Sequence, residues 1–448
     1  MKLTKKEENM KYILIALITI VFIGCSTNPI QIKPIDKMSK NEIYDLVHLP
    51  QSVKPYLKNI KIDSIKSTQH NYEENYFRVW NKIPADSKET AMWPFRAYNL
   101  NESYGENLQP LEENFFLSMK NNANFEKYKT INKNALTLNH LNIRGFPTAK
   151  PLLRNPSLAG EGFPFDYMQN STISANKPIL VSHYSKDKEW VYIFTSFTGG
   201  WVKANEIVIV DKKYTNLWQK AQQVFLIKDG IPIYDKNSRF LFKSKIGMML
   251  ALVSEDSQSY TVLTVASYKG DKPLYLKSKI SKTIAHKGIM RYTKENITLI
   301  MDEISKSKYG WGGIYNQRDC SSTLRDFYAP FGLWLPRNSS QQAKKGKVIQ
   351  LDGLSKELKI KTIKDEAIPF KTLFYKKGHI LLYVGTYDDT IVVFHNIWGI
   401  RTKEKGKEGR LVVGKAIFSS LSLGSHQRNF DKEAEILTNL KSMNILSW

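Results

Sequence analysis

The sequence predicts an α+β multidomain protein with a mostly helical N-terminal segment, two small β-barrels and a C-terminal α+β domain. Its 448 residues correspond to about three domains at roughly 150 residues each. Its composition, with 42% hydrophobic and 24% charged residues, is that of a globular protein and excludes a disordered or collagen-like chain. The spacing of apolar residues changes twice, from helical periodicity to short alternating runs near residue 141, and again near residue 289.

The first 24 residues have the pattern of an export signal. Lysines precede an uncharged apolar run, residues 12–23, which is too short to span a membrane. The run ends in Gly24-Cys25, which resembles a bacterial lipoprotein cleavage box and implies a lipid anchor on the thiol of Cys25. A free cysteine after a plain signal or anchor helix is the alternative. Because Ser26 is not the Asp that retains lipoproteins at the inner membrane, we expect a protein of the cell envelope, anchored in the outer membrane and facing the periplasm.

The charge and cysteine content narrow the function further. The chain has 66 Lys and Arg against 42 Asp and Glu, a net charge of +24. Such an excess is typical of proteins that bind nucleic acid, an anionic membrane or an acidic polymer. The alternative is that the positive charges are spread over solvated surfaces without a partner. Export makes nucleic acid an unexpected partner. Two cysteines exclude a disulfide scaffold and a Cys-based zinc cluster. With Cys25 acylated, Cys320 is a lone thiol in an exported protein and therefore a candidate nucleophile.

Each domain is predicted from its own pattern. Residues 25–40 are polar and contain proline, which favours a tether, and residues 41–140 have helical periodicity. Within residues 141–215, alternating apolar runs at 178–182, 190–194 and 200–202 are bounded by turn residues, as in a small barrel. A second, looser set at 230–234, 247–252 and 260–265 predicts another barrel over residues 216–288. Residues 289–448 form the last domain, which begins with a predicted helix over 293–306.

The local sequence places Cys320 at the start of a helix. Asp319-Cys320-Ser321-Ser322 precedes apolar residues spaced at i, i+3, i+4 and i+7, namely Leu324, Phe327, Tyr328 and Phe331. Free N–H groups and the positive end of the helix dipole at such a position favour a thiolate and an oxyanion. A buried structural cysteine is the alternative interpretation.

Two histidines are predicted to lie on one face of a β-hairpin. Residues 378–385 and 391–395 alternate like strands around a turn at 387–389. His379 and His395 are 16 residues apart, an even number, so they point to the same face as cross-strand neighbours. A nucleophile, a base and a third group that orients the base can be built from Cys320 and this pair.

The order of these motifs resembles the NlpC/p60 family of bacterial cell-wall cysteine peptidases, which have a papain-like fold. The motifs are Tyr309-Gly-Trp-Gly-Gly, Asp319-Cys-Ser, Leu335-Pro-Arg-Asn-Ser, Gly378-His-Ile and Phe394-His. The segments 160–167 and 190–201 resemble the first of two bacterial SH3-like domains that accompany this peptidase. The resemblance implies that Cys320 is the nucleophile, His379 the base, and His395 the residue that fixes the ring of His379.

The resemblance also implies a substrate. Relatives with this domain order cut the amide bond between γ-D-Glu and the diamino acid of peptidoglycan stem peptides. Asp319 and Ser321 would bind the free amine of the N-terminal L-Ala, and Tyr309 and Trp311 would line the site. The first SH3-like domain would restrict access to peptides with a free L-Ala. No cofactor and no metal are expected, since the sequence has no H-E-x-x-H motif, clustered acidic loop or phosphate loop.

Some alternatives stay open at this point. The family's usual Gly after Asp-Cys-Ser is Ser322 here, and Asn396 could replace His395 as the residue that orients His379. A catalytically inactive lipoprotein that binds the cell wall through its SH3-like domains is the second functional hypothesis. An acyltransferase or amidase with the same nucleophile is the third. The oligomeric state is not indicated by the sequence.

Overall fold

The computed structural model describes residues 43–62, 69–268 and 272–447. The described residues belong to one compact unit that begins at Ile43. The expected signal, Cys25 and the expected tether lie outside the described residues. Across the described ranges, none of the helices combines the length and the apolar character that a membrane crossing needs.

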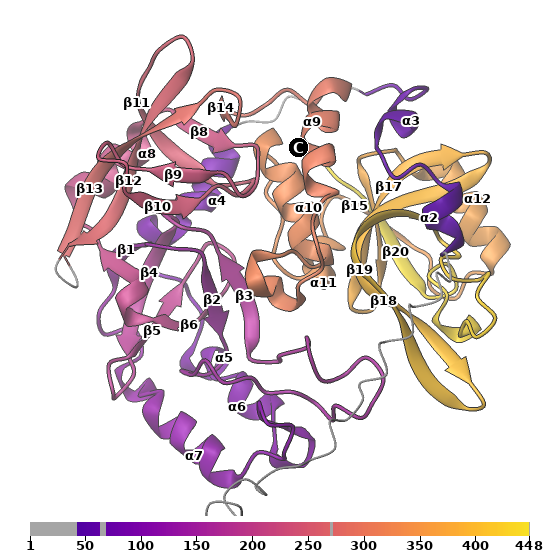
Figure 1. The fold of residues 1–448 in the computed structure, drawn as a ribbon, viewed down its shortest axis with the longest axis horizontal. Helices are drawn as coiled ribbons and strands as arrows, with labels where there is room; N and C mark the ends of the chain where they lie inside the picture. The colour runs from indigo at the N-terminus through magenta and orange to yellow at the C-terminus, as the bar shows by residue number, and fades with distance from the viewer. Residues whose placement is uncertain (1–42, 63–68, 269–271, 448) are drawn as a thin grey trace, which may run out of the picture. The chain divides into compact units, whose positions relative to one another are not determined.

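The N-terminal region is helical, as predicted. Its helices are α2 (Tyr44–His48), α3 (Lys54–Leu57), α4 (Gln69–Asn81), α5 (Lys88–Ala91), α6 (Pro94–Ala97) and α7 (Glu113–Asn122). On the buried face of α4, the Trp80 indole N–H donates to the carbonyl oxygens of Ala135 (3.2 Å) and Ile179 (3.1 Å). One turn earlier, the Tyr76 hydroxyl donates to the carbonyl oxygen of Met249 at 3.1 Å. Helix α4 therefore packs against both sheet domains that follow it (Figure 1).

The first sheet domain has seven strands in the order β3-β2-β6-β5-β4-β1-β7. The strands are β1 (Lys133–Thr137), β2 (Leu141–Arg144), β3 (Gln169–Ile173), β4 (Pro178–Tyr184), β5 (Trp190–Phe194), β6 (Gly199–Lys203) and β7 (Ile207–Ile209). The three predicted strands correspond to β4, β5 and β6. Strand β1 comes from residues that the sequence pattern assigned to the helical region, because its five residues pair with both β4 and β7.

The second sheet domain follows α8 (Lys212–Lys220), whose N-cap Asp211 accepts from the Tyr214 N–H. Its strands are β8 (Gln223–Leu226), β9 (Pro232–Tyr234), β10 (Phe240–Lys243), β11 (Met249–Glu255), β12 (Ser259–Tyr268), β13 (Lys272–Ser281) and β14 (Ala285–Lys287). Five of them form a sheet in the order β13-β12-β11-β8-β14, and β9 pairs with β10.

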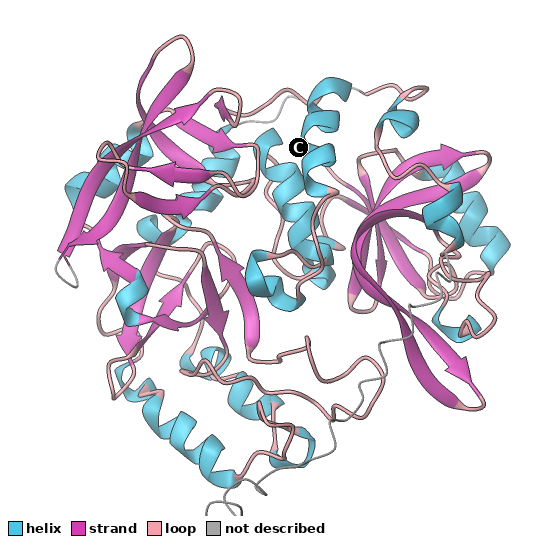
Figure 2. Ribbon diagram, viewed as in Figure 1, coloured by secondary structure: helices cyan, strands magenta, loops and turns pink. Residues whose placement is uncertain are grey.

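The C-terminal domain combines helices with a six-stranded sheet in the order β15-β20-β16-β17-β18-β19 (Figure 2). The helices are α9 (Lys294–Ile304), α10 (Cys320–Tyr328), α11 (Ser339–Gln342) and α12 (Lys356–Glu366). The strands are β15 (Lys347–Gln350), β16 (Thr372–Lys376), β17 (His379–Tyr387), β18 (Thr390–Glu404), β19 (Lys407–Ser420) and β20 (Leu440–Ile445). Helix α10 packs on β17 and β18, and an apolar cluster containing Leu324, Phe327 and Phe394 fills the space between them.

The predicted hairpin is formed by β17 and β18. Tyr387 pairs with Thr390 across a two-residue turn. Asp388 and Asp389 occupy that turn with φ of 45° and 62°, a left-handed conformation that Asp tolerates better than most residues. The α+β multidomain fold predicted from the sequence is therefore confirmed, together with the hairpin that carries both histidines.

Candidate active site

Cys320 is the first residue of α10, as the sequence predicts. The Asp319 carboxylate caps the helix by accepting the Ser322 N–H at 2.9 Å, and the Ser322 hydroxyl accepts the Asp319 N–H at 2.9 Å. Ser322, which replaces the family's usual glycine, thus completes a capping box. The two residues fix the first turn of α10 and with it the position of Cys320, a residue that is 9% exposed.

The surroundings of Cys320 favour a thiol rather than a thiolate. Burial and the neighbouring Asp319 carboxylate raise the pKa of Cys320 to about 12, although the backbone N–H groups of Ile380 and Ser321 donate toward the sulfur and act in the opposite direction. The first turn of α10 acts in the direction that the sequence predicts, since the Ser321 N–H lowers the pKa, but the net shift has the opposite sign. A helix dipole stabilises a charge by up to about 2 kcal/mol, and here desolvation of the sulfur outweighs it.

His379 and His395 are brought together as predicted. Nε2 of His379 lies 2.8 Å from Nδ1 of His395, with the rings nearly edge to face at a centroid distance of 5.1 Å. Nε2 of His395 lies 3.0 Å from the Ser419 hydroxyl, so the second ring is held at both nitrogens. Burial, followed by the nearby Lys376 ammonium, lowers the pKa of His379 to about 3, and burial and His379 lower the pKa of His395. Both rings are therefore neutral near pH 7.

One nitrogen of His379 remains available for proton transfer. Within the described residues, Nδ1 of His379 has no hydrogen-bond partner, since only Nε2 is engaged. The sulfur of Cys320 has no hydrogen bond to the ring of His379 among these residues, but it does receive the N–H of Ile380, the next residue in the chain. The thiol and the ring therefore lie at the same end of β17.

Asn396 forms hydrogen bonds other than the one to His379 that the sequence left open for it. Its side-chain amide donates to the carbonyl oxygens of Arg318 at 3.0 Å and Lys308 at 3.3 Å. These contacts hold the loop that leads into Asp319 and Cys320. The hydrogen bond to His379 comes from His395 instead.

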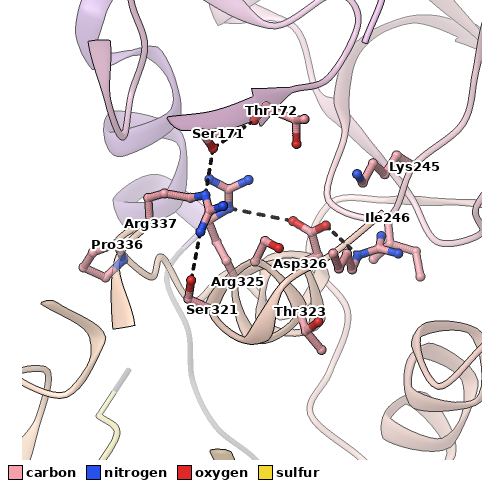
Figure 3. Close-up of polar contacts among 12 residues, drawn as sticks. Ser171, Thr172, Lys245, Ile246, Ser321, Thr323, Arg325, Asp326, Pro336 and Arg337 are labelled. Carbon is pink, nitrogen blue, oxygen red and sulfur yellow. Dashed lines mark hydrogen bonds and ion pairs between the residues drawn. The ribbon is translucent and has the colours of Figure 1, made fainter. Parts of the chain in front are cut away.

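Asp319 and Ser321 are both held by Arg337, a residue to which the sequence analysis gave no role. The Arg337 guanidinium donates to the Asp319 carboxylate at 2.5 and 3.2 Å and to the Ser321 hydroxyl at 2.8 Å. Its Nε donates to the Ser171 hydroxyl of β3 at 2.7 Å (Figure 3). Although burial acts to raise the pKa of Asp319, the adjacent Arg337 cation keeps it below its usual value. The carboxylate is thus ionised and already paired.

Aromatic side chains from two domains surround the predicted lining residues. Tyr309 lies 5.9 Å from Trp398, measured between ring centroids. Trp311 lies 5.3 Å from Phe165 and 5.5 Å from Tyr167, both in the segment before β3. Phe165 also lies 5.8 Å from Trp398, which closes the group. Trp398 follows His395 by three residues, and that proximity is the only sequence signal that could have found it.

The first sheet domain also contributes an acidic side chain here. The Tyr167 hydroxyl donates to the half-buried Glu161 carboxylate at 2.9 Å. Because the Tyr167 ring contacts Trp311, this carboxylate is held at the side of the site that the first sheet domain covers. The sequence analysis did not single out Glu161.

A pair of glycines allows this close approach of the two domains. Gly312 and Gly313 lie in the 3₁₀ segment η4 (Trp311–Asn316) with φ of 57° and 84°. A Cβ on Gly312 would overlap the carbonyl oxygen of Gln169, and one on Gly313 would overlap the hydroxyl of Thr172. Only glycine fits there, so η4 is docked against β3.

No cluster of three or more His, Cys, Asp and Glu side chains is placed to hold a metal ion in the described part of the chain.

Comparisons with known proteins identify the domains. The sequence matches the NlpC/P60 family over residues 306–402 and the N-terminal NLPC_P60 stabilising domain over residues 14–128. It matches an SH3 domain of the SH3b1 type over residues 151–203 and one of the SH3b2 type over residues 211–257. No curated protein sequence matches the chain significantly.

Among solved structures, an NlpC/P60 endopeptidase from Photobacterium damselae subsp. piscicida superposes with a TM-score of 0.76 and 23% identity. The match covers 89% of this chain and 97% of that one, which shows a shared fold. An NlpC/P60 family protein from Bacillus cereus ATCC 10987 matches at a TM-score of 0.43 and 15% identity, over 61% of this chain and 81% of that one. The chain therefore has, in this order, an N-terminal NLPC_P60 stabilising domain, an SH3b1 domain, an SH3b2 domain and a C-terminal domain of the NlpC/P60 family.

Proposed function

We propose that this protein is a cysteine endopeptidase that hydrolyses the γ-D-Glu–diamino acid bond of peptidoglycan stem peptides with a free N-terminal L-Ala. One observation carries the proposal: Cys320 begins α10 beside the N-terminal end of β17, where His379 is bound to His395 by one ring nitrogen and has the other free. A nucleophile, a base and an orienting group are the parts that amide hydrolysis by a thiol requires.

The protonation states support a general-base mechanism. Because both the thiol and the imidazole are neutral near pH 7, His379 takes the proton of Cys320 as the sulfur attacks the amide carbon. The imidazolium then gives that proton to the leaving amine of the diamino acid. A water molecule, deprotonated by the same ring, attacks the thioester and releases the γ-D-Glu carboxylate.

Donors for the developing oxyanion are available beside the sulfur. The first turn of α10 has N–H groups without intrahelical partners. The Tyr309 hydroxyl is a further donor, close enough to Cys320 and Asp319 for their charges to act on it. Burial, followed by the neighbouring Cys320 and Asp319, raises the pKa of Tyr309 well above its usual value. The hydroxyl therefore stays protonated and able to donate.

The contacts of Asp319 and Glu161 indicate which of the two carboxylates binds the free N-terminal amine of the substrate. Asp319 is paired with Arg337 and is 9% exposed, so its charge is largely compensated. The Glu161 carboxylate accepts a hydrogen bond from the Tyr167 hydroxyl, forms no ion pair with another described residue, and lies at the aromatic group around Trp311. We therefore propose that the amine of L-Ala binds to Glu161 and Ser321. Asp319 contributes indirectly, because it fixes the first turn of α10.

The test is digestion of L-Ala-γ-D-Glu-diaminopimelate and of the same peptide with an acetylated amine. We expect the full chain to release L-Ala-γ-D-Glu from the free peptide, at least about a hundredfold less from the acetylated peptide, and none above background with Cys320→Ala. Equal product from the wild type and Cys320→Ala would refute the enzyme assignment. Equal rates on both peptides would refute only the amine site.

The burial of Cys320 gives the second hypothesis, an inactive wall-binding protein, a specific observation to rest on. Sedimentation with purified sacculi separates the two. Strong binding without turnover of any stem peptide favours the binding protein, whereas turnover excludes it.

We also propose that the chain is held at the outer membrane by acylation of Cys25. The sequence at residues 22–26 supports this, and cells given radiolabelled palmitate should label the unmodified chain but not the Cys25→Ala variant. Equal labelling of the two chains, or no label in either, would contradict it.

A further inference from the structure

A small cavity lies where four parts of the protein meet. Its volume is about 30 Å³, enough for one water molecule or one monatomic ion, since a water needs roughly 10–15 Å³ on this measure. Tyr72 of α4, Lys177 and Phe197 of the first SH3 domain, Ile246 of the second and Arg325 of α10 are among its lining residues. The cavity is separate from the candidate active site, although Arg325 and Cys320 share one helix.

Lys177 is the first of two cations at this cavity that lack a matching anion. It is 8% exposed, and no carboxylate forms an ion pair with it in the described part of the chain. Its ammonium nitrogen lies 3.2 Å from the ring centroid of Tyr76 and 5.7 Å from that of Trp334. Aromatic faces attract a cation but do not neutralise it.

Arg325 is the second cation. Its guanidinium lies 4.2 Å from the ring centroid of Phe197, and its Nη1 is buried without a hydrogen-bond partner. Its nearest carboxylate is Asp326, at 3.8 Å from Nε. Asp326 already accepts from Nε of Arg318 at 2.8 Å, so it compensates Arg325 only weakly.

The charge around the cavity does not balance. Its charged lining residues are Lys177, Arg325 and Asp326, and the Asp326 carboxylate already accepts a hydrogen bond from Arg318. Uncompensated buried charges are costly, and an unpaired buried donor such as Nη1 is rare in folded proteins. A water molecule would satisfy the donor but not the charge.

We propose that this cavity is a halide site in which one chloride ion lies between Lys177 and Arg325. The ion would accept the free N–H of Arg325 and compensate the Lys177 ammonium. The ion joins α10 to the first SH3 domain, because Arg325 belongs to α10 and Lys177 to that domain. Burial lowers the pKa of Lys177 well below its usual value, and a neighbouring anion counteracts that shift. The role is structural and is independent of the reaction at Cys320.

Bromide in place of chloride tests the site directly. Crystals of the full chain soaked in sodium bromide should show an anomalous difference peak in the cavity between Lys177 and Arg325. A cavity without an anomalous peak, whether it holds a water molecule or nothing, overturns the proposal. So does a peak found only on the protein surface.

Thermal unfolding in solution provides a second test that needs no crystal. The Tm of the full chain should be higher in sodium chloride than in sodium gluconate at equal ionic strength, because gluconate is too large for the cavity. Lys177→Met should abolish the difference between the two salts, and Arg325→Gln serves if that variant does not fold. Lys213→Met, the same change at an exposed lysine of α8, should keep it. Equal Tm values in the two salts for the unmodified chain overturn the proposal.

Discussion

Cys320 should react slowly with a thiol-alkylating probe at neutral pH. With a pKa of about 12, roughly 10⁻⁵ of the sulfur is ionised at pH 7, against about 3% for an ordinary cysteine with a pKa near 8.5. Alkylation by iodoacetamide should therefore be about three orders of magnitude slower than that of free cysteine. The rate should rise about tenfold per pH unit from pH 6 to pH 9 without a plateau. Quantifying the alkylated peptide that contains residue 320 by mass spectrometry separates this thiol from Cys25.

The control variant for this measurement is His379→Ala. A neutral imidazole stabilises no thiolate, so removing it should leave the alkylation rate at pH 7 nearly unchanged while hydrolysis is lost. A rate that levels off below pH 7, or one that falls strongly in His379→Ala, would show that an ion pair exists before substrate binds. Either result would refute the reasoning from burial.

Three further predictions follow from the site. His395→Ala should lower kcat by about 10²-fold with little change in KM, because the ring of His379 loses its orienting bond, and His395→Gln should recover part of the rate in steady-state assays. Arg337→Met should destabilise the protein by about 3 kcal/mol in denaturant unfolding at pH 7, since it leaves a buried carboxylate unpaired. The folded-state pKa of Asp319 lies below its unfolded value of about 3.9. The stabilisation that the ionised carboxylate gains from Arg337 is therefore present above pH 4 and is lost as the pH falls through the folded pKa. A destabilisation by Arg337→Met that stays constant down to pH 3 would contradict the assignment. Gly313→Ala should lower the Tm and increase proteolysis between the first SH3 domain and the peptidase domain, and an unchanged digestion pattern would count against the tight packing of η4 on β3.

Much of the fold and of the site follows from local patterns. The start of α10 is encoded by Asp319 and by apolar residues at helical spacing, and the structure places its first residue at Cys320. The hairpin follows from two alternating runs around Asp388-Asp389, and the even spacing of His379 and His395 puts both rings within hydrogen-bond distance. These features depend on residues close in the sequence, which is why they can be predicted.

The remaining features depend on contacts between distant segments. Arg337 contacts Ser171, which is 166 residues away, and Gly312 is needed because Gln169 approaches it from another domain. Neither contact leaves a periodic signal in either segment. The direction of the pKa shift of Cys320 also could not be predicted, because it is set by how completely tertiary packing removes water from the sulfur.

A transient bond between substrate and sulfur tests the central claim most directly. Wild-type protein mixed with L-Ala-γ-D-Glu-diaminopimelate and quenched in acid before one turnover should yield a peptide in which Cys320 carries L-Ala-γ-D-Glu as a thioester. In His379→Ala, where no base takes the thiol proton, the adduct should not form. Release of L-Ala-γ-D-Glu with no adduct on Cys320 at any quench time, or with Cys320→Ala still active, would contradict the account.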